Sequence, residues 1–155
     1  MTSALSRDEL ETWSALATML EWLPPALDAQ LARDSELTHF EYGILFALVN
    51  AEGRTLRMSV LAGYANSSLS RLSRAVTRLE NRGWMTRAPD PADGRSTLAA
   101  LTAEGVERFD QATPGHVDTV RRLVLDHLTA AQARQLRDIS RRITEGIRAE
   151  DGWRP

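Results

Sequence analysis

Arginine and hydroxyl side chains recur along residues 68–82 at a spacing that places them on one side of a helix. A helix advances about 100° per residue, so Arg74 lies at the centre of this side. Within about 60° of it lie Ser70, Arg71, Thr77, Arg78 and Asn81. None of these side chains is acidic, and all can donate hydrogen bonds. Such a face is suited to phosphates and to the edges of nucleic-acid bases.

The other side of this helix carries an apolar stripe that we expect to be buried, consisting of Leu69, Leu72, Val76 and Leu79. Just before the helix, Ser67 and Ser68 offer hydroxyl groups where the helix N-terminus could receive a phosphate. A short predicted helix and a turn come first, as in a helix-turn-helix, whose second helix enters the major groove. The alternative is an arginine face that contacts only solvent.

A polar turn with the sequence DPADGRS occupies residues 90–96, between two short and partly apolar runs. This pattern predicts a two-stranded ribbon over residues 84–102. Arg95, near its tip, could enter a minor groove, whose negative potential attracts guanidinium groups. Asp93 can accept from Arg95 or from turn N–H groups, and the alternative is that the two residues only stabilise the turn. Arg87, in the first strand, is also a predicted DNA contact.

Charge is unevenly distributed along the chain, although the net charge is only −2. Residues 54–95 contain eight arginines and three acidic residues, whereas the remainder contains 11 arginines and 18 acidic residues. A basic segment in an otherwise acidic chain is typical of a site for a polyanion. Double-stranded DNA is therefore the expected partner.

The composition limits the other classes of protein. The absence of cysteine excludes disulfides, thiolate metal ligands and thiol-based redox sensing. We find no apolar run of about 18 residues and no signal-peptide pattern, so we expect a cytoplasmic protein without a membrane partner. The length of 155 residues suits one domain with a core, or a smaller domain with helical extensions.

Three capping-box patterns, at residues 6–9, 38–41 and 129–132, predict helix starts. The first helix should run to about Arg33, with a kink or break at the Pro24-Pro25 pair, and the second to about Ala51. Further helices are predicted over 58–64, 68–82, 103–128 (irregular near Pro114) and 130–148, with Gly83 as a left-handed cap after the fourth. The predicted fold class is mainly α with a small β-wing.

The run from LTHFEYG at residue 37 to LTAEG at residues 101–105 resembles the winged helix-turn-helix core of the MarR family of bacterial transcription regulators. The features that carry the resemblance are RLENRGWMTR leading into the ribbon, the Asp-Gly-Arg at 93–95 and the LTAEG motif. The resemblance implies a homodimeric regulator, expected to be a repressor, on a pseudo-palindromic operator. Residues 37–102 would form the DNA-binding domain, with 68–82 as recognition helix and 93–95 as wing motif. Residues 1–36 and 103–155 would form the dimerisation region.

An apolar stripe in the last third of the chain is suited to dimerisation, and comprises Leu123, Leu125, Leu128, Leu136, Ile139, Ile143 and Ile147. The alternative is burial of this stripe within one chain. The resemblance also implies a small aromatic or anionic effector between the dimerisation helices and the winged domain. The candidate effector residues are Trp13, Trp22, His39 and Tyr42, and their alternative role is in the core or an interface.

We expect neither a cofactor nor a metal. His39 with Glu36 and Glu41, or His116 with Asp118, could supply oxygen and nitrogen ligands, but no helical histidine pair is present. We also expect no enzyme, because the three histidines fall in separate predicted elements and no glycine-rich phosphate loop or nucleophile elbow occurs. The alternative function is a winged-helix module for protein contacts, although its docking face should include apolar anchors.

Overall fold

The structure, a computed structural model, describes residues 4–150. The described elements follow in the order α1 (Arg7–Ser35), α2 (His39–Val49), β1 (Thr55–Arg57), α3 (Met58–Tyr64), α4 (Leu69–Asn81), β2 (Met85–Asp90), β3 (Asp93–Leu101), α5 (Ala103–Leu123) and α6 (Ala130–Glu150). Short 3-10 helices occupy Glu52–Arg54 and Leu125–His127. The predicted fold class, mainly α with a small β-wing, is confirmed. The outermost residues of the predicted dimerisation segments lie outside the described residues.

All three predicted capping boxes are present. The Thr38 hydroxyl accepts from the Glu41 N–H and the Glu41 carboxylate accepts from the Thr38 N–H, both at 3.0 Å. Ser6 pairs with Glu9 in the same way at the start of α1, and Thr129 with Gln132 at the start of α6. Each box satisfies N–H groups that a helix start leaves without partners, and so fixes where the helix begins.

The predicted effects of proline on the two long helices do not appear as breaks. α1 is continuous through Pro24-Pro25, and α5 is continuous through Pro114. The second half of α1 packs along α5, and a Cβ on Gly115 of α5 would lie 3.3 Å from Nε2 of Gln30. This close packing holds both helices together across the prolines. α5 does end five residues earlier than predicted, because a 3-10 turn follows it.

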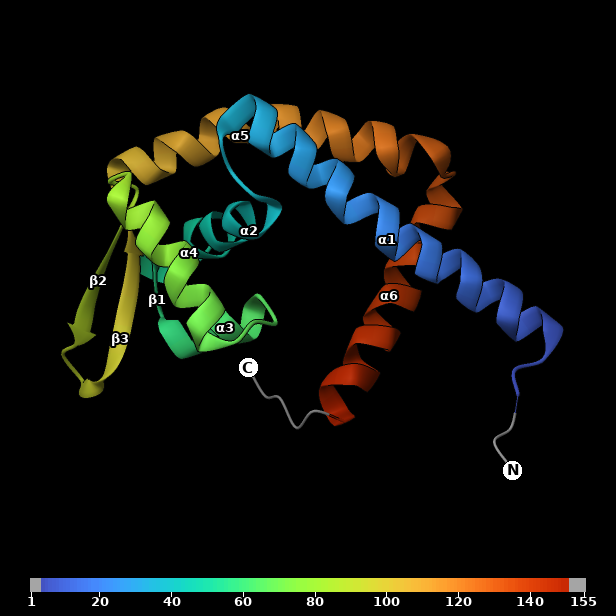
Figure 1. The fold of residues 1–155 in the computed structure, drawn as a ribbon, viewed down its shortest axis with the longest axis horizontal. Coiled ribbons are helices and arrows are strands. Elements are labelled where there is room, and N and C mark those ends of the chain that lie inside the picture. The colour runs from blue at the N-terminus through green and yellow to red at the C-terminus, as the bar shows by residue number, and fades with distance from the viewer. Residues whose placement is uncertain (1–3, 151–155) are drawn as a thin grey trace.

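The sheet has three strands, in the order β1-β3-β2, and both pairings are antiparallel. The sequence predicted only the ribbon formed by β2 and β3. β1 is missed because it has three residues and its partners lie far along the chain, with Thr55 opposite Ala100. Pairing with β1 anchors the base of the ribbon to the helical body, while the tip projects beside α4 (Figure 1).

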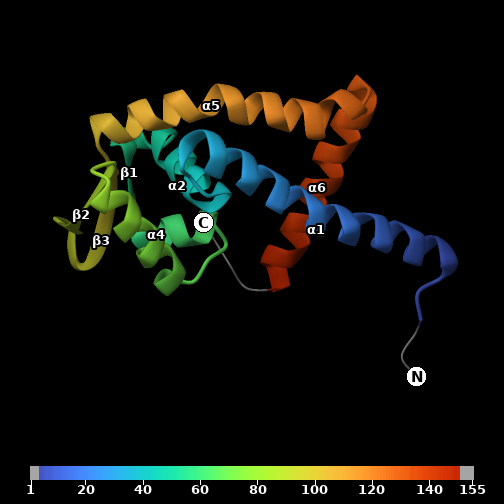
Figure 2. The same ribbon diagram turned by 45° about the horizontal axis from the view of Figure 1, so that its top comes forward.

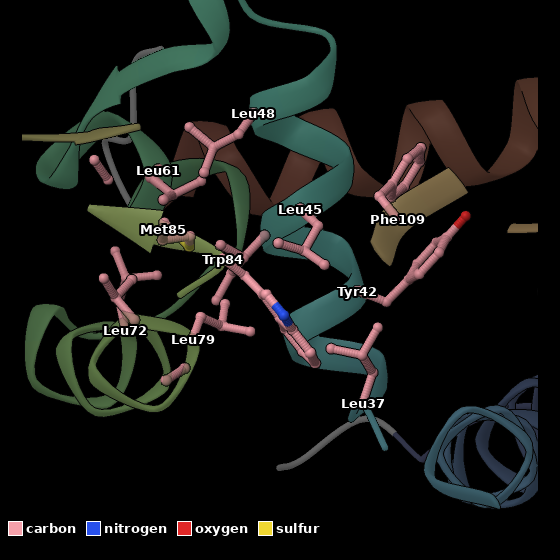
Figure 3. Packing of buried hydrophobic residues seen from close by; sticks show 14 of the residues in the cluster. Leu37, Tyr42, Leu45, Leu48, Leu61, Leu72, Leu79, Trp84, Met85 and Phe109 are labelled. Carbon is pink, nitrogen blue, oxygen red and sulfur yellow. The ribbon is translucent and has the colours of Figure 1, made fainter. Parts of the chain in front are cut away.

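The core lies between α2, α3, α4, the start of β2 and α5, as Figure 3 shows. Trp84 and Met85 enter it directly after α4, because Gly83 adopts a left-handed φ of +77° and turns the chain. The predicted cap at Gly83 is therefore confirmed. The predicted burial of Leu69 is wrong, since this side chain is 55% exposed. Leu69 is the first residue of α4 and lies beyond the reach of the core, whereas Ala75 is buried.

Two helical segments extend away from this core. α5 spans the winged part, α1 crosses beside it, and α6 and the N-terminal half of α1 reach away (Figures 1 and 2). None of the described residues of α6 is buried. Its predicted stripe, Leu136, Ile139, Ile143 and Ile147, is exposed, which confirms that this helix does not bury its apolar face within the chain.

Candidate nucleic-acid interface

The predicted arginine face of α4 is exposed. Ser68 caps the helix by accepting from the Arg71 N–H at 3.2 Å, so its hydroxyl is engaged at the helix start. Ser70, Ser73, Arg74, Thr77 and Arg78 together line a shallow hollow along the helix surface. Within residues 4–150, no side-chain hydrogen bond or ion pair engages Arg74. Arg74 is thus an unengaged cation at the centre of the face.

The first turn of α2 supports two other arginines of this face. Arg78 Nε donates to Glu41 Oε1 at 2.8 Å, and the Glu41 side chain is only 5% exposed. The Arg71 guanidinium lies over the Phe40 ring, 4.2 Å from its centroid. Both side chains remain exposed at the surface. The contacts from α2 therefore restrict the orientations of Arg71 and Arg78 in the absence of a ligand.

Arg87 lies between the wing and α4. Its Nε and Nη2 donate to Glu80 Oε2 at 3.0 and 2.6 Å. Nη1 donates to the Ser73 hydroxyl and Nη2 also to the Thr77 hydroxyl, each at 2.9 Å. These contacts engage both Arg87 and Thr77, two of the predicted DNA-binding residues, within the protein.

The tip of the wing leaves Arg95 free while Asp93 holds the turn. Asp93 Oδ1 accepts from the Arg95 backbone N–H at 3.1 Å, and Oδ2 accepts from the Ser96 hydroxyl at 2.9 Å. The predicted role of Asp93 in holding turn N–H groups is confirmed. Among the described residues, none forms a side-chain hydrogen bond or ion pair with the Arg95 guanidinium. Asp93 and Arg95 do not form a side-chain pair.

Arg57 and Asp90 make a second tie, which sequence reasoning missed, from β1 to the turn end of β2. Arg57 Nε donates to Asp90 Oδ2 at 2.7 Å, from β1 to the end of β2. The Ala92 N–H donates to the other carboxylate oxygen at 2.8 Å. That backbone hydrogen bond, followed by the Arg57 contact, holds the pKa of Asp90 below its ordinary value. An arginine and an aspartate 33 residues apart give no local sequence signal.

A crevice of about 320 Å³ joins α4 to the wing. Its lining includes Leu69, Ser73, Arg87, Arg95 and Thr97, so it brings the start of α4 next to the wing arginine. Ser73 is a member that sequence reasoning did not select, although it precedes Thr77 by one helical turn. The structure thus combines the arginine face of α4 and the wing tip into one surface rich in arginine and hydroxyl groups.

A separate cavity of about 600 Å³ lies between α2, β1 and α3. Its lining is mostly apolar and comprises His39, Phe40, Gly43, Phe46, Ala47, Asn50, Ala51, Leu56, Leu61, Tyr64 and Ala65. Of the four predicted effector residues, only His39 lines it. Trp13 and Trp22 lie on the exposed part of α1, where Trp22 is 76% exposed. Their role remains a prediction.

Tyr42, the fourth predicted effector residue, lies in a buried ring cluster beside this cavity. Its ring centroid is 4.3 Å from that of His116 and 5.2 Å from that of Phe109. Burial and the nearby His39 lower the pKa of His116 below its ordinary value, which favours the neutral ring. Across residues 4–150, no cluster of three or more potential metal-ligating side chains is found. None of the described helices has the length and apolarity to span a bilayer.

Comparisons with known proteins agree on one family. Residues 35–96 match the family model described as MarR family. The structure resembles crystal structures of two MarR family transcriptional regulators from Streptomyces coelicolor. Sco3205, solved in complex with DNA, is 42% identical with a TM-score of 0.90, and the match covers 94% of this chain and 91% of that one. AbsC is 33% identical with a TM-score of 0.90, and the match covers 96% and 99%.

Two curated relatives match over a shorter segment. An uncharacterized HTH-type transcriptional regulator of Bacillus subtilis, YdcH, is 31% identical over 81 residues, which are 51% of this chain and 55% of the relative. The transcriptional regulator HosA of Escherichia coli O111:H- is 34% identical over 79 residues, which are 51% and 57% of the two chains. The chain thus matches little more than half the length of these curated relatives.

Proposed function

This chain belongs to the MarR family of transcription regulators, and from that premise we propose that it is a homodimeric repressor that binds a pseudo-palindromic operator in the cytoplasm. The observation that carries the proposal is a pair of unengaged arginines, Arg74 on α4 and Arg95 on the wing, on adjoining parts of one surface. The named relatives are transcription regulators, and we assign this chain no catalytic activity and no cofactor.

In this proposal α4 enters the major groove and the wing rests on the adjacent minor groove. Arg74 and Ser70 read base edges, because they lie on the exposed face of a helix of the length that fits the groove. Arg95 enters the minor groove, where a free guanidinium is attracted most strongly if the groove is narrow. Near the start of α4, the DNA backbone is contacted by Ser67, Ser68 and Arg71. The DNA complex of Sco3205 supports DNA as the partner.

Arg74→Ala is expected to weaken binding to the operator by about 1–3 kcal/mol and to reduce discrimination against scrambled DNA, if the side chain bonds a guanine at two points. Fluorescence anisotropy with duplexes tiled across the DNA next to the gene, over a salt series, measures both quantities. Arg122→Ala is the control, because this exposed arginine lies in the last turn of α5. Figure 1 shows that end of α5 far from the wing. Equal losses on operator and scrambled DNA would instead mean that Arg74 contacts only phosphates.

The same measurement separates the regulator from a module for protein contacts. A regulator should bind one duplex tightly with a steep salt dependence, and Arg95→Ala should weaken that binding. Weak binding that is equal on every duplex and unaffected by Arg95→Ala would contradict the proposed function. It would favour the protein-docking alternative, in which Arg95 has no DNA to contact.

The exposed apolar faces support the homodimer. The side chains at Leu10, Trp13 and Leu20 of α1 are about half exposed, as are those of the α6 stripe. Exposed apolar surface of this extent, repeated at helical spacing, is typical of an interface between chains. A second copy would bury both faces, and its symmetry would match that of a pseudo-palindromic operator.

We further propose that the cavity beside α2 receives a small aromatic or anionic effector that releases the DNA. The cavity is of the size that small-molecule sites have, and it is apolar with a few polar groups, including His39 and Asn50. The buried pair of Tyr42 and His116 packs beside the cavity but does not line it.

Gly43→Leu is expected to fill the cavity and to weaken binding of benzoate, a simple aromatic anion, by about tenfold or more, which is about 1.4 kcal/mol. A Cβ at Gly43 would meet no atom within 4 Å, so the larger side chain can enter without displacing the backbone. Isothermal titration calorimetry measures the loss. Gly94→Leu, at the open tip of the wing, is the matched control. Equal benzoate affinity in both variants would contradict this location.

A further inference from the structure

We propose that Arg87 is a positioning residue that fixes the wing relative to α4 and thereby sets the distance between the two DNA-contacting parts. This inference rests on the proposed function, in which α4 and the wing bind DNA together. It changes the role of Arg87 from the predicted DNA contact to an internal brace, which acts on the operator only through Arg95.

The hydrogen bonds of Arg87 leave little capacity for DNA. A guanidinium has five N–H donors, and four hydrogen bonds use Nε, Nη1 and Nη2 of Arg87 within the protein. The acceptors Ser73, Thr77 and Glu80 lie about one turn apart along one side of α4. The guanidinium therefore spans roughly two turns of the recognition helix from a strand of the wing.

Charge supports the same role. Glu80 is the one acidic residue of α4, and the side chains of Glu80 and Arg87 are only 25% and 27% exposed. Their pairing neutralises a carboxylate that would otherwise repel the phosphate backbone close to the recognition face. An isolated arginine aimed at DNA would instead leave this carboxylate half-buried without a partner, which is costly.

The brace completes a two-sided attachment of the ribbon. On one edge, β3 pairs with β1 and Arg57 bonds Asp90 at the end of β2. On the other side, Arg87 connects the middle of β2 to α4. With only the first tie, the tip that carries Arg95 could swing relative to Arg74. With both ties, the two arginines keep one spacing, which selects one geometry of adjacent grooves.

The test is a double-mutant cycle on the operator with Arg87→Ala, Arg95→Ala and the combined variant. If Arg87 acts through the wing, each single variant should lose affinity on the order of tenfold, and the combined variant should lose no more than Arg95→Ala alone. Hydroxyl-radical footprints should show loss of protection in the flanking minor grooves and retained protection where α4 binds. A general loss of stability would weaken both regions together.

Glu80→Ala is a second variant, for which the two roles of Arg87, direct DNA contact and internal brace, predict opposite changes in operator affinity. It removes a negative charge near DNA, so a direct DNA contact by Arg87 would be strengthened and the affinity for the operator would rise. The brace proposal expects lower operator affinity, the same loss of flanking protection and a raised affinity for scrambled DNA. Additive losses in the cycle, or tighter operator binding by Glu80→Ala, would overturn the proposal.

The outcomes also separate this inference from the proposed function. Wild-type protein that selects no duplex would contradict the proposed function itself. So would an Arg95→Ala variant that binds as well as wild type. Selective wild-type binding that depends on Arg95, with independent losses at Arg87, would leave the regulator intact and remove only the brace.

Discussion

Ile143→Asp in α6 is expected to convert the homodimer into monomers and to reduce operator affinity by about 10²- to 10⁴-fold, the range of avidity that two linked sites provide. Ile143 lies in the apolar stripe of a helix that buries no described residue within its own chain. An aspartate there would place an unpaired charge in the proposed interface, which strongly disfavours association. Light scattering after size-exclusion chromatography should show a mass near 17.2 kDa in place of twice that value.

Arg141→Asp is the control for this expectation. At about 100° per residue, position 141 lies on the opposite side of α6 from Ile143, so the new carboxylate would remain in solvent even though this reversal lowers the net charge by two. This control should stay dimeric and bind the operator as wild type does. A dimeric Ile143→Asp variant, or a monomeric one with full operator affinity, would rule out α6 as the dimer interface.

Gly105→Ala is expected to destabilise the fold by about 3 kcal/mol, at the upper end of the cost of overpacking. A Cβ at this position would overlap the Trp84 carbonyl oxygen and would lie 3.0 Å from Leu101 Cδ2. Retreat of the carbonyl would strain a junction in which Thr102 N–H donates to Trp84 O at 3.1 Å. The Thr102 hydroxyl also donates to Gly83 O at 2.7 Å, so the start of α5 is tied to the start of β2.

Urea denaturation followed by circular dichroism measures this loss. Gly43→Ala is the matched control, since its new Cβ would meet no atom within 4 Å on the exposed side of α2. Alanine in place of glycine within a helix should stabilise the protein by about 0.5–1 kcal/mol. Similar midpoints for the two variants would show that α5 can shift away from β2 without cost.

Local signals predicted most of the helices. The capping box at Thr38, the apolar spacing of α2 and the glycine cap at Gly83 each act within a few residues, so the sequence alone located them. β1 could not be located in this way, because its stability comes from pairing with β3 more than 40 residues later. Leu69 was misassigned for a related reason. Periodicity gives the side of a helix, whereas burial also depends on how far the core extends along it.

For the candidate site, the sequence predicted which residue types are exposed more reliably than it predicted their contacts within the protein. Arg74 and Arg95 were selected as cations on a helix face and a turn, and both are exposed and unengaged among the described residues. The partners of Arg87 could not be inferred, because they depend on how the ribbon lies against α4. Likewise, Trp13 was selected as an aromatic residue for the pocket that the resemblance implies, whereas the cavity lies between α2, β1 and α3. The proposed division at residues 37–102 stays a prediction.

At Phe40, one side chain contacts both the cavity and an arginine of the α4 face. The ring lines the cavity and also lies under the Arg71 guanidinium. A molecule that displaced this ring would therefore alter Arg71 directly, without a relay through the rest of the fold. This double role of one residue also constrains how the sequence of such a regulator can change during evolution. A substitution at position 40 changes what the cavity admits and how the arginine is held, so the two properties cannot be selected independently there.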